Sequence, residues 1–454
     1  MTLKTRRGVF PMHLTPFEAF MYMNDHPRFP MTFVVRFAFS GDLVQDAFQS
    51  AVDRALQRHP MLRALIRPAK ASRDCWVQAE DYDSEIDFGS MDDPIQVVGA
   101  SEYIDLKNEI GFRGFVRKDE NRAIFYAVFH HSAVDGIGAY QFLGDVLWFY
   151  ADQFGASVGE LSDYCESDLR KRLRANIGQI PAWQLSTQRE YETNDYQKLS
   201  PRNEGDGLLG MNHPFPAIQV HEFNRQQYRE LRLDAQKRNQ TVNDRLLEAL
   251  FTTMLRWNEV DGSGSGKEFC VLMPLDLRTT DQVNFSAANL VTSSFIHRSP
   301  SQIQDQENLA SSLIKETVQL KHSRHESEFM TTLFSVPSRW TEAHSMFEEE
   351  KCHATAVLSN AGDPTKRFQN EFSKKAGKLI AGNLVLEEVG GASPLRNSTR
   401  LTVNIFTYQR KLSINLRMDP QFFTASDSQG FLKQYVDTFL GGSVNHSPVV
   451  IAEN

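Results

Sequence analysis

Two adjacent histidines stand in the run Phe129–Gly136, which reads Phe-His-His-Ser-Ala-Val-Asp-Gly. An imidazole changes its charge near neutral pH, so His130 or His131 could remove a proton from a hydroxyl or an amine as a general base. Asp135, four residues further on, could orient that imidazole, as carboxylates do in serine hydrolases. The residue types in this run therefore indicate catalysis by proton transfer.

The segments on either side place these residues at a corner between a strand and a helix. Ala123–Phe129 is short, aromatic and β-branched, which predicts a buried strand. Apolar residues then recur at three- and four-residue spacing from Ile137 to Tyr150, which predicts a helix. Because side chains alternate along a strand, His130 and His131 should point to opposite sides, and only one of them should face a given cavity.

The block His-His-x-x-x-Asp-Gly resembles the active-site motif of the CoA-dependent acyltransferase superfamily. That superfamily includes chloramphenicol acetyltransferase, the condensation domains of peptide synthetases and the bacterial wax ester synthase/diacylglycerol acyltransferases. The resemblance implies that His131 is the general base, with His130 as a structural neighbour. It also implies that Asp135 is mostly structural and that Gly136 leaves room for the substrate.

The resemblance assigns roles to two segments in the second half of the chain. In the family the motif aspartate pairs with an arginine of an Asp-Leu-Arg-type segment, so a buried ion pair is expected between Asp135 and Arg278. The segment Ser-Asn-Ala-Gly at 359–362 is similar to one that lies close to the active-site tunnel in wax ester synthase-like and alcohol acetyltransferase-like members. Ser359 or Asn360 could then donate a hydrogen bond to the oxyanion or position the acyl group; an ordinary turn is the alternative reading.

Capping signals mark two helices that share this resemblance. Thr15 with Glu18 predicts a helix start in a segment similar to the opening of wax ester synthase-like chains. Thr241 with Asp244 is a capping-box variant ahead of a long helix, again as in wax ester synthase-like proteins. His59 precedes a proline and is interpreted as a helix-end residue, not a ligand.

The composition argues against several other classes of function. The net charge of −8 argues against a general affinity for nucleic acid. The four cysteines are far apart and show no CxxC spacing, which favours a reducing compartment and gives no metal-site signal. No stretch reaches the length of about 18 apolar residues that a transmembrane helix needs, and no signal peptide is recognised. We expect a cytoplasmic protein and leave contact with a membrane surface open.

The length of 454 residues predicts two domains. We expect an N-terminal lobe over 1–177, a crossover segment of low periodicity over 178–215, and a C-terminal lobe over 216–454. The resemblance implies an α/β fold with two chloramphenicol-acetyltransferase-like lobes, each a mixed or antiparallel sheet with helices, and a tunnel between them. Near the C-terminus, Leu401–Thr407 and Leu412–Met418 predict a hairpin.

These expectations together indicate an acyltransferase of the EC 2.3.1 type. It would move an acyl group from a CoA or pantetheine thioester to a small alcohol or amine, and an acyl carrier protein is an alternative donor. The thioester is a substrate, so no resident cofactor and no metal are expected. One alternative is a catalytically silent condensation-like protein that binds a lipid or an acyl carrier. Another is a hydrolase that pairs His131 with a serine, which is disfavoured because no Gly-x-Ser-x-Gly elbow occurs.

Overall fold

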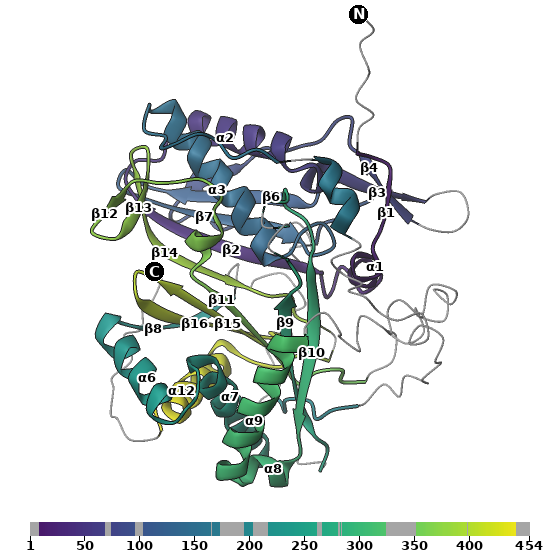
Figure 1. Ribbon diagram of the computed structural model, residues 1–454, viewed down its shortest axis with the longest axis vertical. Coiled ribbons are helices and arrows are strands. Elements are labelled where there is room, and N and C mark those ends of the chain that lie inside the picture. The colour runs from purple at the N-terminus through teal and green to yellow at the C-terminus, as the bar shows by residue number, and fades with distance from the viewer. Residues whose placement is uncertain are drawn as a thin grey trace, which may run out of the picture.

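The computed structural model describes residues 9–68, 74–95, 103–164, 166–172, 195–202, 217–260, 266–279, 282, 284–323, 351–396 and 398–441. These residues form two α/β lobes that follow each other along the long axis of the molecule (Figure 1). The first lobe holds most of the N-terminal elements, and the second holds most of the C-terminal ones. The two-lobed α/β fold predicted from the sequence is therefore confirmed.

A seven-stranded sheet forms the centre of the first lobe. Its strands, in spatial order, are β12 (Lys374–Lys375), β13 (Lys378–Ala381), β14 (Leu384–Ala392), β2 (Thr32–Ser40), β7 (Arg122–His130), β6 (Phe112–Lys118) and β5 (Asp87–Ser90). Helices α2 (Gln45–Arg58) and α3 (Gly136–Gln153) pack against each other over this sheet (Figure 1). Every residue of β7 after Arg122 is buried, which explains why the strand is a continuous apolar run instead of an alternating one.

A smaller sheet and one helix flank this lobe. The sheet contains β1 (Met12–His13), β4 (Asp74–Gln78) and β3 (Ala64–Pro68), and the short helix η1 (Pro60–Arg63) directly precedes β3. A second short helix, η2 (Glu166–Lys171), follows α3 in the sequence. Helix α1 spans Pro16–Met23 and begins with the predicted capping box. The Glu18 N–H donates to Thr15 Oγ1 at 3.2 Å, and the Thr15 N–H donates to Glu18 Oε2 at 2.8 Å.

The second lobe contains a six-stranded mixed sheet. Its strands, in spatial order, are β10 (Val291–Arg298), β9 (Phe269–Asp276), β11 (Ala356–Gly362), β15 (Leu401–Tyr408), β16 (Lys411–Met418) and β8 (Gln219–Phe223). Strand β11 runs parallel to β9 and β15, and the other pairs are antiparallel. The β15–β16 hairpin confirms the prediction for this part of the sequence.

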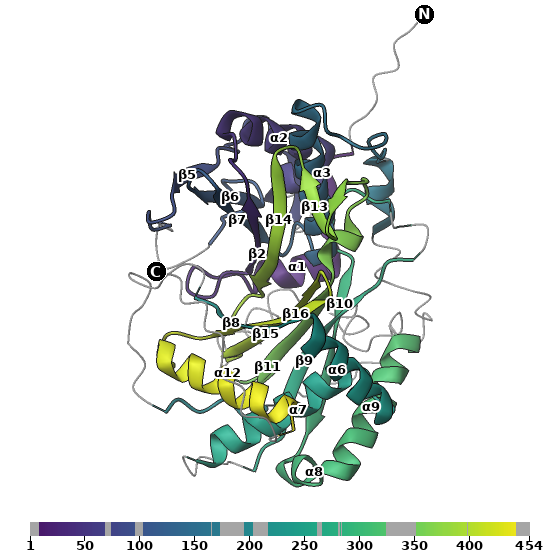
Figure 2. The same cartoon turned by 90° about the vertical axis from the view of Figure 1, so that its left-hand side faces the viewer.

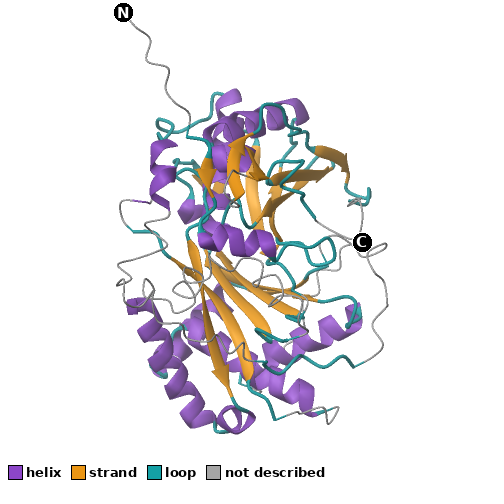
Figure 3. Ribbon diagram, turned by 90° about the vertical axis from the view of Figure 1, so that its right-hand side faces the viewer, coloured by secondary structure: helices purple, strands orange, loops and turns teal. Residues whose placement is uncertain are grey.

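Helices cover the side of the second sheet that faces away from the first lobe (Figure 3). They are α6 (Arg225–Lys237), α7 (Val242–Glu259), α8 (Pro300–Gln304), α9 (Gln306–Ser323) and α12 (Ala425–Phe439), and the short helix η5 (Pro364–Arg367) follows β11. The predicted capping box of α7 is present, because the Asp244 N–H donates to Thr241 Oγ1 at 3.1 Å. None of the described helices has the length and apolar character needed to cross a membrane.

Strand β14 crosses from the second half of the sequence into the first lobe. It pairs antiparallel with β2, with Val385 opposite Ser40 and Ala392 opposite Val34, and it lies beside β2 in Figure 2. The first sheet is thus completed by residues that the sequence analysis places in the range 216–454. The domain boundaries themselves stay a prediction, since most of the expected crossover over 178–215 lies outside the described residues.

Candidate active site

The motif occupies the corner between β7 and α3, as predicted. Strand β7 ends at His130 and helix α3 begins at Gly136. Asp135 is the N-cap of α3, where its Oδ1 accepts a hydrogen bond from the Gly138 N–H at 2.9 Å. This cap satisfies one of the helix's unpaired N–H groups and fixes the direction in which the chain leaves the strand.

The two histidines differ in burial. His130 is fully buried, with Nδ1 accepting from the Ser132 N–H at 3.1 Å and Nε2 lying 3.2 Å from Asp25 Oδ2. His131 keeps an intermediate exposure, and its ring centroid lies 5.1 Å from that of Phe33. His130 is held within the protein, whereas His131 is the histidine that solvent can reach.

The backbone and ring of His131 are in well-defined environments. The His131 N–H donates to the Met31 carbonyl at 2.7 Å, and the His131 carbonyl accepts from Asn289 Nδ2 at 2.6 Å. The ring atom Nδ1 is buried and has no hydrogen-bond partner among the described residues. The other ring nitrogen, Nε2, is not buried in this way and forms no hydrogen bond with a described residue. Nε2 is therefore the ring nitrogen that a reactant could approach.

Burial sets the protonation state of His131. Burial lowers the pKa of its imidazole, and the neighbouring His130 and Arg396 side chains act in the same direction. The backbone of His131 and the Asp135 carboxylate raise the pKa, but by less, so it lies below the ordinary value of a histidine. The imidazole is therefore neutral at neutral pH, as a general base must be.

The predicted ion pair between Asp135 and Arg278 is present. Arg278 Nη1 donates to Asp135 Oδ2 at 2.8 Å and Nη2 donates to Oδ1 at 2.9 Å, with both side chains buried. Burial alone raises the pKa of Asp135, but the Arg278 guanidinium and the N–H groups of Gly138 and Leu290 together hold it below its usual range. The carboxylate is therefore held ionised at the corner and is fully occupied by these partners.

Arg278 lies a few residues before a segment of the second half that docks on the first lobe. The Leu290 N–H donates to Asp135 Oδ2 at 2.7 Å, and the Ala287 N–H donates to His59 Nδ1 at 2.8 Å. His59 is completely buried at the end of α2, so its helix-end position is confirmed, and it also receives this contact from the other half of the chain. The docked segment, 285–290, joins the hydrophobic core of the first lobe.

Two glycines near the start of α3 differ in the space around them. A Cβ placed on Gly136 would meet only Tyr140 Cε2, at 3.9 Å. A Cβ on Gly138 would lie 2.6 Å from Val134 Cγ2 and 2.9 Å from the backbone N and O of Ala288. Gly138 is therefore needed for close packing of the docked segment, whereas Gly136 borders open space. The role that the resemblance implies for Gly136 stays a prediction.

Ser359 and Asn360 lie within β11, not in a turn after it. A register shift occurs between Asn360 and Gly362, and the Gly362 N–H donates to Asn360 Oδ1 at 3.1 Å. Asn360 is exposed, and its Nδ2 donates to Asn243 Oδ1 at 3.1 Å, at the start of α7. No described hydrogen bond or ring contact joins Ser359 or Asn360 to His131, so their roles at the active site stay a prediction.

Sequence reasoning missed two residues that lie close to His131. Asn289 holds the His131 carbonyl, and Arg396 contributes to the low pKa of the imidazole. Asn289 follows the Asp-Leu-Arg segment closely, which could have drawn attention to it. Arg396 lies in the connection from β14 to β15 and carries no local pattern that links it to the motif.

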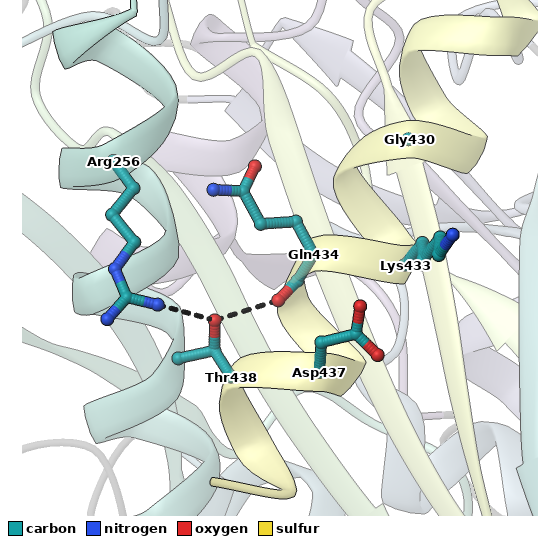
Figure 4. A pocket seen from close by; sticks show the side chains of 6 residues that line it. All are labelled: Arg256, Gly430, Lys433, Gln434, Asp437 and Thr438. Atoms are coloured by element: carbon teal, nitrogen blue, oxygen red, sulfur yellow. Dashed lines mark hydrogen bonds between the residues drawn. The ribbon is translucent and has the colours of Figure 1, made fainter. Parts of the chain in front are cut away.

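A cavity of about 230 Å³ lies on the second lobe, between α7 and α12 (Figure 4). It is lined by Arg256, Gly430, Lys433, Gln434, Asp437 and Thr438, and Arg256 Nη1 donates to Thr438 Oγ1 at 3.5 Å. None of the predicted site residues lines it. The tunnel beside His131 therefore stays a prediction. The described residues contain no cluster of side chains suited to hold a metal ion.

Comparisons with known proteins find similarity in structure but not in sequence. No family model matches the chain, and no curated protein is similar to it in sequence. Among solved structures, the trichothecene 15-O-acetyltransferase TRI3 from Fusarium sporotrichioides matches with a TM-score of 0.66 and 12% identity, covering 95% of this chain and 94% of that one. The first condensation domain of the calcium-dependent antibiotic synthetase matches with a TM-score of 0.64 and 10% identity, covering 98% and 99%.

A third match is polyketide synthase associated protein 5 from Mycobacterium tuberculosis, with a TM-score of 0.62 and 13% identity, covering 96% of this chain and 100% of that one. The chain thus has, over nearly its whole length, the two-lobed fold that acyltransferases and condensation domains share. At the level of the fold, this confirms the resemblance predicted from the His-His-x-x-x-Asp-Gly block.

Proposed function

We propose that this protein is an acyltransferase that moves an acyl group from a CoA or pantetheine thioester to a hydroxyl or amine acceptor. The observation that carries the proposal is the state of His131. Its imidazole has a lowered pKa and an intermediate exposure at the end of β7, and its Nε2 bonds to none of the described residues. The fold shared with acyltransferases and condensation domains supports the same chemistry.

In the proposed reaction Nε2 of His131 takes the proton of the acceptor while the acceptor oxygen or nitrogen attacks the thioester carbon. The C–S bond then breaks, and the departing sulfur receives the proton from Nε2. General base catalysis contributes a factor of about 10² to 10⁴, and alignment of the substrates supplies much of the rest. The thioester is already activated, so no covalent enzyme intermediate is required.

Asp135 does not act on the imidazole in this proposal. Its two carboxylate oxygens accept hydrogen bonds from Arg278, Gly138 and Leu290, which leaves it a structural role at the corner. Gly136 supplies the space beside the corner. Ser359 and Asn360 remain the candidates for stabilising the oxyanion or positioning the acyl group. A donor bound to a carrier protein, the lack of a resident cofactor and a cytoplasmic location also stay predictions.

Replacement of His131 tests the proposal. The assay measures thiol release when acyl-CoA esters are supplied with a panel of alcohols and amines. His131→Ala should lower the turnover by at least about 10² while the melting temperature stays close to that of the wild type. His322→Ala, which alters a histidine on the exposed surface of α9, is the matched control and should leave turnover unchanged.

Two outcomes would contradict the proposal. Unchanged turnover in His131→Ala would show that His131 is not the general base. A wild-type protein that binds acyl-CoA but releases no thiol with any acceptor would favour the catalytically silent binding protein.

A further inference from the structure

Arg396 lies next to the candidate active site, and its partners among the described residues are neutral. Its Nη2 donates to Asn24 Oδ1 at 2.7 Å, and its Nη1 donates to Met31 Sδ at 3.5 Å. The guanidinium carbon lies 5.6 Å from the centroid of the Phe20 ring. A guanidinium has five N–H donors, so these contacts leave most of its hydrogen-bonding capacity unused.

The nearest acidic residue does not neutralise Arg396. Asp25 uses Oδ1 to accept from the Met31 N–H at 2.7 Å, and its Oδ2 lies 3.2 Å from His130 Nε2. Within the part of the chain that the structure describes, no carboxylate lies within ion-pair distance of Arg396. Burial lowers the pKa of Arg396 to about 10, and Asp25 only partly offsets this. Arg396 is therefore still a cation at neutral pH, and none of the described carboxylates is in contact with it.

Met31 contacts both Arg396 and the backbone of His131. The Met31 carbonyl accepts the hydrogen bond from the His131 N–H at 2.7 Å, while its sulfur accepts from Arg396. Arg396 keeps an intermediate exposure, as His131 does, so neither side chain is sealed inside the protein. A desolvated guanidinium with unused donors binds a carboxylate more strongly than a surface arginine does, because the surroundings screen its charge less.

We infer that Arg396 binds a carboxylate carried by one of the two substrates, beside the bond that reacts. This inference rests on the proposed function and specifies its substrate class. The phosphates of CoA are poor candidates for this position, because the pantetheine arm separates them from the thioester that His131 serves. The carboxylate therefore belongs either to the acyl group, as in a dicarboxylic acyl thioester, or to the acceptor, as in an amino acid.

Binding measurements on matched pairs of ligands test the inference without requiring turnover. In the first arm, malonyl-, succinyl- and glutaryl-CoA are titrated calorimetrically against propionyl-, butyryl- and pentanoyl-CoA, which differ only in the terminal carboxylate. In the second arm, leucine is titrated against 3-methylbutylamine. The wild type should bind the carboxylate member of a pair about 10- to 100-fold more tightly in one arm, and that arm identifies the source of the carboxylate.

Variants separate a binding role from a structural one. Arg396→Gln should remove the preference by weakening the carboxylate ligand about 10- to 100-fold and the neutral ligand by less than about threefold. Arg396→Lys should restore part of the preference, since it keeps the charge but not the planar fork. Arg28→Gln removes an exposed arginine bonded to Gln421 and should leave the preference intact.

The inference is overturned if the wild type shows no preference in either arm, or if Arg396→Gln keeps the preference or weakens both members of a pair equally. The last result would mean that Arg396 only fixes α1 through Asn24. These outcomes are distinct from a failure of the proposed function. If neutral substrates are turned over in a reaction that depends on His131 and no carboxylate preference is found, this inference fails but the acyltransferase proposal does not.

Discussion

Asn289 Nδ2 donates a hydrogen bond to the backbone carbonyl of His131 at 2.6 Å, so a residue from the second half of the chain holds the proposed base of the first lobe. Together with the bond from the His131 N–H to Met31, this fixes the backbone of the base from two sides. The placement of the imidazole therefore depends on the docked segment and not on β7 alone.

Replacement of this donor tests that dependence. Asn289→Leu should lower kcat about tenfold with little change in KM, because the imidazole loses part of its alignment in the transition state. The protein should also lose about 1 kcal/mol of unfolding free energy, since a partly buried carbonyl is left without this donor. Asn308→Leu, on the exposed side of α9, is the control. Wild-type kcat and wild-type stability in Asn289→Leu would show that the contact positions nothing.

The buried ion pair between Asp135 and Arg278 should show strong coupling. Asp135→Asn and Arg278→Met should each cost about 3–5 kcal/mol, because each leaves a buried charge without its partner. The double variant should cost clearly less than the two single variants together. Urea denaturation of the four proteins measures the coupling. Asp276→Asn removes a half-buried carboxylate next to Arg278 and should cost less than about 1 kcal/mol. Additive effects of Asp135→Asn and Arg278→Met would contradict the expected coupling.

The acid limb of the pH profile should lie below the ordinary pKa of histidine. The proposed base must be unprotonated, and burial lowers the pKa of His131. At about pH 6.5, where half of an ordinary histidine is protonated, the enzyme should therefore keep more than half of its maximal activity, and the midpoint of the acid limb should lie at lower pH. A profile of kcat/KM against pH measures this. An acid limb at or above pH 6.5 would mean that the reacting group is not this imidazole.

The two glycines of α3 form a matched pair of variants. Gly138→Ala should destabilise the protein by about 1–3 kcal/mol, because the new Cβ would overlap Val134 and the backbone of Ala288. Gly136→Ala has open space and should leave the melting temperature unchanged or raise it slightly, since alanine favours a helix. If the space beside Gly136 holds substrate, this variant should raise KM. Thermal unfolding and steady-state kinetics separate the two cases, and equal melting temperatures for both variants would refute the packing argument.

Much of the fold follows from local patterns in the sequence. The Thr15–Glu18 and Thr241–Asp244 boxes predict helix starts because cap and helix lie within one turn. The β15–β16 hairpin is predicted for the same reason, since its strands are neighbours in the sequence. The Asp135–Arg278 pair is different, because only the resemblance to a known family suggested it.

What the sequence could not reveal depends on contacts between distant segments. Strand β14 contains Glu387, Glu388 and two glycines, so it lacks a clear strand pattern, and its partner β2 lies far away in the sequence. Arg396 can be linked to the candidate site only through its contacts with Met31 and Asn24, which are far from it in the sequence. Asn289 likewise cannot be linked to His131 without knowing how the second half docks.

The pairing of β14 with β2 also has a consequence for biosynthesis. Until the ribosome has added β14, β2 has one edge without a partner, and its row of N–H and C=O groups is open to pairing with another chain. The N-terminal half thus leaves the ribosome with an incomplete sheet, and it cannot complete its folding before the strands of the second half have been synthesised. Fragments that end before β14 should aggregate when expressed alone, and the nascent chain is a natural client for chaperones that shield exposed strand edges.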